Sequence, residues 1–174
     1  MQGYEKDFIQ TVRLCNMLIG TDTKLIFYLL VVRVSNPYGP EQDFTRGVGF
    51  IDAALKRTLH QEPTEIWGDG ENIRDYIFIE DVCHMIGSLL EYSGKDDTFN
   101  ISSGVGVSQN EIIRMLQKIG LRPQVIYKNK PSVDIRKIIL DNNRIRGVWN
   151  HQPIVLKDGL RIYYEYLKKT YTGE

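Results

Sequence analysis

A run of apolar residues at positions 25–34, Leu25-Ile-Phe-Tyr-Leu-Leu-Val-Val-Arg-Val34, is the feature that most limits the folds open to this chain. β-Branched and aromatic residues favour a strand. Because polar residues do not alternate with apolar ones, the run predicts a strand covered on both faces, as in the parallel sheet of an α/β protein. It is too short to cross a bilayer as a helix. A strand of this kind needs neighbours in a sheet.

Helical and strand patterns alternate along the rest of the chain, which predicts an α/β fold class. Ser108 and Glu111 form a capping box at the start of one helix. Glycines end several of the helices, including Gly20, Gly94 and Gly120. The helices are expected at 4–19, 50–59, 81–93, 108–119 and 158–169, and the further strands at 65–67, 76–79, 98–101, 125–127 and 136–140.

The overall charge argues against nucleic acid as a partner, since 22 Lys and Arg balance 22 Asp and Glu. Cys15 and Cys83 are far apart and predict two buried, reduced thiols rather than a disulfide or a reactive pair. The three histidines are scattered and predict no metal site. Charged residues near the N-terminus interrupt any signal-peptide pattern. The expected location is cytoplasmic, with no membrane partner.

Several loop motifs occur in a fixed order. Arg33-Val-Ser-Asn-Pro-Tyr-Gly-Pro40 is followed by Ile66-Trp-Gly-Asp-Gly-Glu-Asn-Ile-Arg-Asp-Tyr-Ile-Phe-Ile-Glu-Asp-Val82, and then by Phe99-Asn-Ile-Ser-Ser-Gly104. With the capping box and a late Asp134, this order resembles the C-terminal half of the extended short-chain dehydrogenase/reductase family, which includes UDP-glucose 4-epimerase and the nucleotide-sugar dehydratases. The resemblance implies an extended Rossmann-type protein whose N-terminal dinucleotide-binding half is absent from this chain.

The resemblance assigns substrate contacts to two motifs. Arg74 corresponds to the Arg that contacts the substrate diphosphate, and a guanidinium suits phosphate oxygens. The alternative is a weak surface pair of Arg74 with Asp75 or Asp81. Asn36 corresponds to a residue where the sugar and diphosphate approach the nicotinamide, and the alternative is an Asn that caps its own loop. Tyr38, Gly39 and Pro40 are expected to shape that loop.

The nucleoside end of the substrate is expected to meet three further segments. By the resemblance, the main chain of Arg46, Gly47 and Val48 approaches the uracil, and Ile66 and Trp67 line the base. The alternative for Trp67 is packing in the core or at its rim. Asp134 corresponds to the acidic residue that accepts from the ribose. The family commonly has an Arg three residues earlier, where this chain has Pro131.

The parts of the family that bind NAD and transfer hydride have no counterpart in this sequence. There is no Gly-x-x-Gly-x-x-Gly turn to hold a pyrophosphate. The catalytic Tyr-x-x-x-Lys pair is also missing, because Tyr4 is followed by Phe8 rather than Lys. Tyr164 and Lys168 have the spacing but lie on the last predicted helix. NAD is therefore implied by the family but not expected to bind this chain alone.

These observations divide the chain into an atypical N-terminal helix at 1–24 and a nucleotide-sugar-binding part at 25–174. The expected function is to bind a UDP-sugar as part of an NAD-dependent sugar epimerase, an isomerase, without complete catalytic machinery. The alternatives are a fragment of a nucleotide-sugar dehydratase and a folded remnant that mainly self-associates. A homo-oligomer such as a dimer is expected because an exposed apolar strand edge pairs with other chains.

Overall fold

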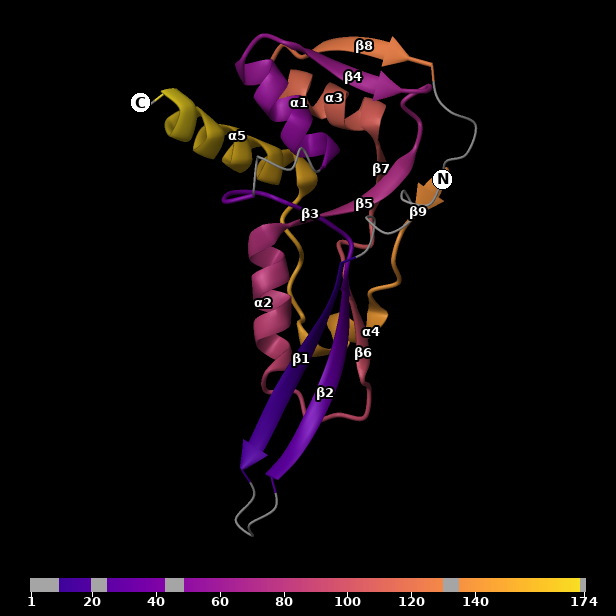
Figure 1. The fold of residues 1–174 in the computed structure, drawn as a ribbon, viewed down its shortest axis with the longest axis vertical. Coiled ribbons are helices and arrows are strands. Elements are labelled where there is room, and N and C mark those ends of the chain that lie inside the picture. Colours follow the sequence, from indigo (N-terminus) through magenta and orange to yellow (C-terminus); the bar gives the residue numbers. More distant parts are fainter. Residues whose placement is uncertain (1–9, 20–24, 43–48, 130–134, 173–174) are drawn as a thin grey trace, which may run out of the picture.

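The computed structural model describes residues 10–19, 25–42, 49–129 and 135–172, and it has the predicted α/β class. Figure 1 shows two regions joined by a central strand: a long-sheet region formed by β1, β2, β6, α2 and α4, and a three-helix region formed by α1, α3, α5, β4 and β8. The elements in chain order are β1 (Gln10–Ile19), β2 (Leu25–Val34), β3 (Asn36–Tyr38), α1 (Phe50–Leu59), β4 (Pro63–Trp67), β5 (Ile73–Phe78), α2 (Ile79–Leu89), β6 (Thr98–Ile101), β7 (Gly106–Ser108), α3 (Gln109–Lys118), β8 (Gln124–Lys128), β9 (Lys137–Ile138), α4 (Asn143–Val148) and α5 (Leu156–Thr172).

The central strand, β5, belongs to both regions because its side chains alternate between two cores. Tyr76 and Phe78 lie in the core of the three-helix region, whereas Ile77 lies in the core of the long-sheet region. Along its edges β5 pairs in parallel with β3 and β9 and antiparallel with β7. A strand of six residues therefore fixes how the two regions meet.

The three-helix region is held by apolar packing and one buried polar contact. Its core contains Ile51, Leu55, Ile66, Ile112, Leu116, Leu160, Tyr163 and Leu167. The Tyr163 hydroxyl donates to the Asp52 carboxylate over 2.6 Å, and Lys56 lies 3.3 Å from the same carboxylate. This contact joins α5 to α1 and satisfies a buried acid that would otherwise destabilise the fold.

The long-sheet region has the order β1-β2-β6, with β1 antiparallel and β6 parallel to β2. Alternate residues of β2, namely Leu30, Val32 and Val34, are buried in the core with α2 and α4. On the opposite face, Leu29 is 54% exposed and Arg33 is also exposed. The prediction that both faces of 25–34 are covered is therefore wrong for its described side chains, because helices cover only one face.

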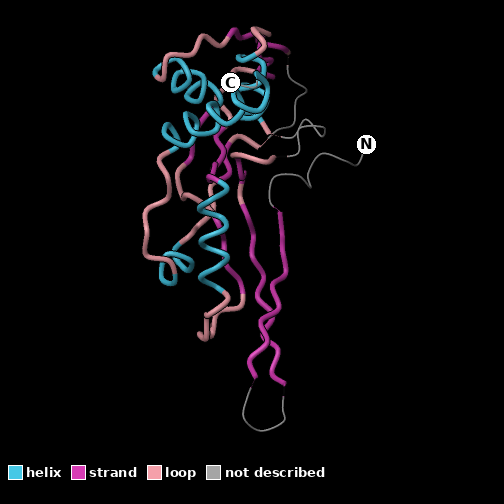
Figure 2. The backbone as a smooth tube through the Cα atoms, turned by 90° about the vertical axis from the view of Figure 1, so that its left-hand side faces the viewer, coloured by secondary structure: helices cyan, strands magenta, loops and turns pink. Residues whose placement is uncertain are grey.

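The predicted helix at 4–19 is also wrong over Gln10–Ile19, which is the strand β1. Ten residue pairs join β1 to β2, from Gln10 opposite Val34 to Ile19 opposite Leu25. This pairing with an apolar strand overrides the helical spacing of the apolar residues. Figures 1 and 2 show the β1–β2 hairpin extending away from the rest of the chain. Residues 1–9 lie outside the described ranges.

Smaller differences concern the helix α2 and the segment around β9. Cys83 is exposed, because Val82 and Met85 are the residues of α2 that face inward, so its predicted burial is wrong. Cys15 has no described side chain. The strand predicted at 136–140 is shortened to Lys137–Ile138. The other predicted elements are present with shifted ends, because α2 spans Ile79–Leu89 rather than 81–93 and begins at a residue predicted as strand. The capping box of Ser108 and Glu111 is confirmed.

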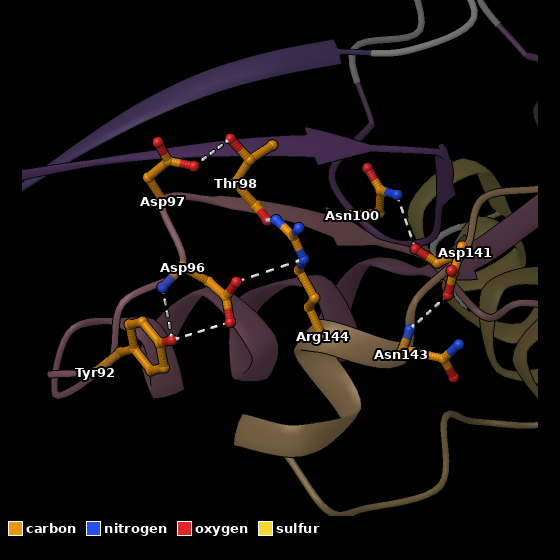
Figure 3. Close-up of polar contacts among 8 residues, drawn as sticks. All are labelled: Tyr92, Asp96, Asp97, Thr98, Asn100, Asp141, Asn143 and Arg144. Carbon is orange, nitrogen blue, oxygen red and sulfur yellow. Dashed lines mark hydrogen bonds and ion pairs between the residues drawn. The ribbon is translucent and has the colours of Figure 1, made fainter.

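The short helix α4, which the sequence patterns did not predict, is fastened to β6 by polar contacts (Figure 3). Arg144 donates to the Thr98 carbonyl oxygen over 3.2 Å and lies 3.6 Å from the Asp96 carboxylate. Asn100 donates to the Asp141 carbonyl oxygen over 2.7 Å. The contacts cross more than 40 positions of sequence, so no local pattern reports them.

Two helical glycines, Gly159 of α5 and Gly87 of α2, form a matched test of how tightly the helices pack. Gly159→Ala is expected to lower the free energy of unfolding by about 1–3 kcal/mol, because its Cβ would overlap the Tyr38 hydroxyl and contact Phe78 at 3.2 Å. Gly87→Ala, with nothing within 4 Å, is expected to raise it by about 0.5–1 kcal/mol. Denaturant unfolding of both variants measures the difference, and equal effects would contradict the packing at Gly159.

Candidate functional site

The buried carboxylate of Asp75, in the middle of β5, organises the loops around the candidate site. One oxygen accepts from the Ser103 amide over 3.0 Å and the Ser103 hydroxyl over 2.7 Å. The other accepts from the Gly104 amide over 3.2 Å and the Leu140 amide over 3.4 Å. Burial raises the pKa of Asp75, and these hydrogen bonds oppose the rise. From the sequence, Asp75 is expected only as an ion-pair partner of Arg74. The Arg-Asp-Tyr motif that contains it and the Ser-Ser-Gly motif were the available signal.

Asn36 lies at the start of β3, opposite Tyr76 of β5 in a parallel pair. Its side-chain amide donates to the main-chain carbonyl oxygen of Asp75 over 2.8 Å. The described contact is thus with another strand, 39 residues away, and not with the residue's own loop. Tyr38, two residues on, is buried against Phe78 with ring centroids 5.4 Å apart, which agrees with its expected structural role.

Arg74 is only 6% exposed, so a pair with Asp75 or Asp81 would not lie on the surface as the alternative supposed. Its guanidinium donates to the Ile73 carbonyl oxygen over 2.9 Å. Burial raises the pKa of Tyr76 to about 12, while the positive charge of Arg74 acts in the opposite direction. The Asp75 carboxylate accepts hydrogen bonds from Ser103, Gly104 and Leu140. The Asp81 carboxylate accepts from the Ile154 amide over 2.8 Å. Arg74 therefore adds a buried positive charge beside Tyr76.

The two residues expected to line the base differ sharply in their surroundings. Ile66 is fully buried in the core of the three-helix region, so its side chain packs inside and lines no open surface. Trp67 is 52% exposed at the end of β4, which excludes plain core packing. Both lie on the two-stranded sheet of β4 and β8, apart from the sheet that carries Asn36 and Arg74.

The structure therefore brings Asn36 and Arg74 together on the neighbouring strands β3 and β5. The short turn between β4 and β5 joins Trp67 to them along the chain. The remaining expected residues, Arg46, Gly47, Val48 and Asp134, lie outside the described ranges, as does Pro131. Their assignments stay predictions.

The described helices do not fit the pyrophosphate of NAD. Such a group needs a helix N-terminus with free amides and no competing negative charge. Each described helix of eight or more residues has a carboxylate in its first turn, and at α3 the carboxylate of Glu111 also takes part in the capping box. The residues concerned are Asp52 in α1, Glu80 and Asp81 in α2, Glu111 in α3 and Asp158 in α5.

Across the described residues, no group of His, Cys, Asp and Glu is arranged to hold a metal ion. No helix found there is long and apolar enough to cross a membrane.

Comparison with known proteins decides the family. The model of the NAD dependent epimerase/dehydratase family matches residues 21–102, which include Asn36, Trp67 and Arg74. This chain belongs to the NAD-dependent epimerase/dehydratase family. The predicted resemblance to this family is confirmed.

The relatives of this family member include proteins with different reactions and nucleotides. dTDP-4-dehydro-6-deoxyglucose reductase of Escherichia coli is 32% identical over 131 residues, covering 74% of this chain and 42% of the reductase. UDP-glucose 4-epimerase of Thermotoga maritima, solved with UDP-glucose, superposes with a TM-score of 0.72 and 35% identity over 80% of this chain and 45% of its own. UDP-glucuronic acid 4-epimerase of Bacillus cereus, solved with UDP-glucuronic acid and NAD, has a TM-score of 0.69 and 28% identity, with 80% and 45% covered. The chain spans less than half the length of each.

The raised pKa of Asp75 predicts a pH dependence of stability in this epimerase-family chain. The folded state binds the proton more tightly than the unfolded state, so the free energy of unfolding falls as the pH rises from about 4, the usual Asp value, through the higher folded pKa. Asp75→Asn removes this contribution and should show a flatter profile. Denaturant unfolding of both proteins across that range measures the difference.

Asp81 is the control, because burial raises its pKa as well and gives a slope of the same sign. Asp81→Asn should keep the contribution of Asp75. A profile that Asp75→Asn leaves unchanged would contradict the effect of burial on Asp75.

Proposed function

We propose that this chain binds a nucleotide sugar, specifically a UDP-sugar, as part of an NAD-dependent sugar 4-epimerase. The burial of the Arg74 side chain in β5, the strand that pairs with β3 at Asn36, is the observation that carries the proposal. The similarity to an epimerase solved with UDP-glucose supports it.

Arg74 suits a diphosphate for reasons of charge and geometry. A partly dehydrated cation acts on an anion with less screening than a surface cation does. The planar guanidinium can donate two parallel hydrogen bonds to phosphate oxygens. Because β7 and β9 both pair with β5 at Arg74, the backbone that carries the guanidinium is fixed on both edges. The site is therefore rigid before the ligand arrives.

The rest of the ligand is assigned to residues around this cation. Asn36 offers both a donor and an acceptor to sugar hydroxyls. The exposed indole of Trp67 offers a flat apolar surface to the base. Arg46, Gly47 and Val48 would approach the uracil with their main chain, and Asp134 would accept from the ribose.

The chemistry of the epimerase is not assigned to this chain alone. Its sequence lacks the Gly-rich turn and the Tyr-x-x-x-Lys pair, and its described helix N-termini do not fit a pyrophosphate. In a complete enzyme, NAD would supply the transient oxidation of the sugar. The residues of this chain would hold the diphosphate and orient the sugar. A dehydratase would use the same binding part, so a dehydratase fragment remains the alternative.

Titration calorimetry with UDP and UDP-glucose tests the binding site. The wild-type chain should bind both, and Arg74→Ala should weaken binding about tenfold to a hundredfold, as expected for losing a hydrogen bond to a charged group. Arg161→Ala, an exposed substitution on α5, should leave the affinity unchanged. Thermal unfolding of each variant checks that it is folded. A folded wild-type chain that binds neither ligand would overturn the proposal.

We also propose that the chain forms a homodimer through the outer edge of β1. Within the described sheet β1 pairs only with β2, which leaves one long edge open. Its sequence has one charge, Arg13, and no Pro or Lys to discourage pairing. Sedimentation at micromolar concentration should show a dimer, which the double substitution Leu14→Lys and Asn16→Lys separates. Ile162→Lys on α5 is the control, and a wild-type monomer would refute the proposal.

A further inference from the structure

The turn at 68–72, between β4 and β5, is a meeting point of segments that are distant in sequence. Asn110, at the start of α3, donates from its side chain to the Asp69 carbonyl oxygen over 2.9 Å and to the Glu71 carboxylate over 2.6 Å. Its own amide donates to the Gly70 carbonyl oxygen over 3.1 Å. The Tyr127 hydroxyl of β8 donates to the Asn110 side chain over 2.9 Å. One amide side chain thus joins the turn, α3 and β8.

The Asp69 carboxylate connects this turn to the chain that enters β9. One oxygen accepts from the Glu71 amide over 3.0 Å and shapes the turn. The other accepts from the guanidinium of Arg136 over 2.7 Å. Both contacts lower the pKa of Asp69, so the carboxylate stays charged at neutral pH.

Main-chain hydrogen bonds place Arg136 next to the candidate site. The Ile73 amide donates to the Arg136 carbonyl oxygen over 2.8 Å. The next two residues of the chain form β9, where Lys137 pairs with Ile73 and Ile138 pairs with Arg74. Arg136 is therefore the residue at which the chain joins the edge of β5 beside Arg74.

We propose that Arg136 is a positioning residue for the nucleotide-sugar site. Through its ion pair with Asp69, Arg136 holds β9 against β5 at Arg74. The inference rests on the proposed function, because it gives Arg136 a role at the site of Arg74. Arg136 acts through β9 and β5 and makes no contact with the ligand itself.

The exposure of the Asp69–Arg136 pair separates this role from a contribution to global stability. The two side chains are 54% and 68% exposed, and an exposed ion pair contributes little to the free energy of unfolding. The effect of the ion pair is local, because it supports the hydrogen bond from the Ile73 amide to the Arg136 carbonyl oxygen, one residue from Arg74. The pair Arg161–Asp158 on α5, with exposures of 65% and 53%, is closely matched and far from β9 in sequence and region.

Substitutions at three residues test the Asp69–Arg136 ion pair and the turn that carries Asp69. Arg136→Gln removes the charge, and Arg136→Lys keeps it. Gly70→Ala acts at the other end, because Gly70 has a φ of +75° and an added Cβ would overlap the Asn110 side chain. Asp69→Asn keeps an acceptor for the Glu71 amide but loses the ion pair.

The experiment measures three quantities on the full chain: UDP affinity by calorimetry, hydrogen exchange of the Ile73 amide by NMR, and the Tm. Arg136→Gln should weaken UDP binding roughly fivefold and speed exchange at Ile73. Its Tm should change no more than that of Arg161→Gln. Arg136→Lys should restore most of the affinity. Asp69→Asn with Arg136→Gln should bind no more weakly than either single variant, and Gly70→Ala should also weaken UDP binding.

Each contrary result identifies what has failed. A folded wild-type chain that binds no UDP would overturn the proposed function and this inference with it. UDP binding by the wild type with unchanged affinity in Arg136→Gln would overturn only the inference. Weaker binding without faster exchange at Ile73 would mean that Arg136 contacts the ligand directly. A larger fall in Tm than in Arg161→Gln would make the pair a structural contact, which also overturns the proposed role.

Discussion

The hydrogen bonding of the buried Asp75 carboxylate is the interaction on which the arrangement of the site depends. Its four donors come from the loop after β6 and from the segment after β9. Without them, a charged group inside the protein would be strongly unfavourable. The backbone carbonyl of the same residue accepts from Asn36. Asp75 thus fixes the elements on both sides of Arg74, its neighbour in β5.

Two further buried acids, Asp52 and Asp81, repeat this arrangement at different joints of the fold. Asp52 joins α1 to α5 through Tyr163, and Asp81 joins α2 to the segment before α5 through the Ile154 amide. The partners are 111 and 73 positions apart, and those of Asp75 are as many as 65 positions away. Each acid is satisfied only when the chain has its native topology, so these contacts favour one arrangement of the helices over alternatives with similar apolar packing.

The structure follows from the sequence where the information is local. The capping box at Ser108 needs only residues 108–111, and Asn36 and Arg74, which the loop motifs assign to one ligand, lie on neighbouring strands. The sequence is not sufficient where distant segments decide the structure. The role of Asp75, the helix α4 and the polar cluster around Asn110 all depend on contacts across 15 or more positions. Ile66 and Trp67 are adjacent and both apolar, so only the packing of β4 could show which one is exposed.

The error over Gln10–Ile19 has the same cause, and it bears on function. Apolar residues spaced for one face of a helix are also compatible with a strand once an apolar partner such as β2 lies beside them. The resulting hairpin lies in the long-sheet region, away from β9 (Figure 1), whereas Arg74 lies in β5 and Arg136 directly precedes β9. Self-association through β1 would therefore use a different surface from ligand binding. Because the two surfaces do not share residues, loss of one property would not imply loss of the other, and a chain that binds UDP can still be a dimer.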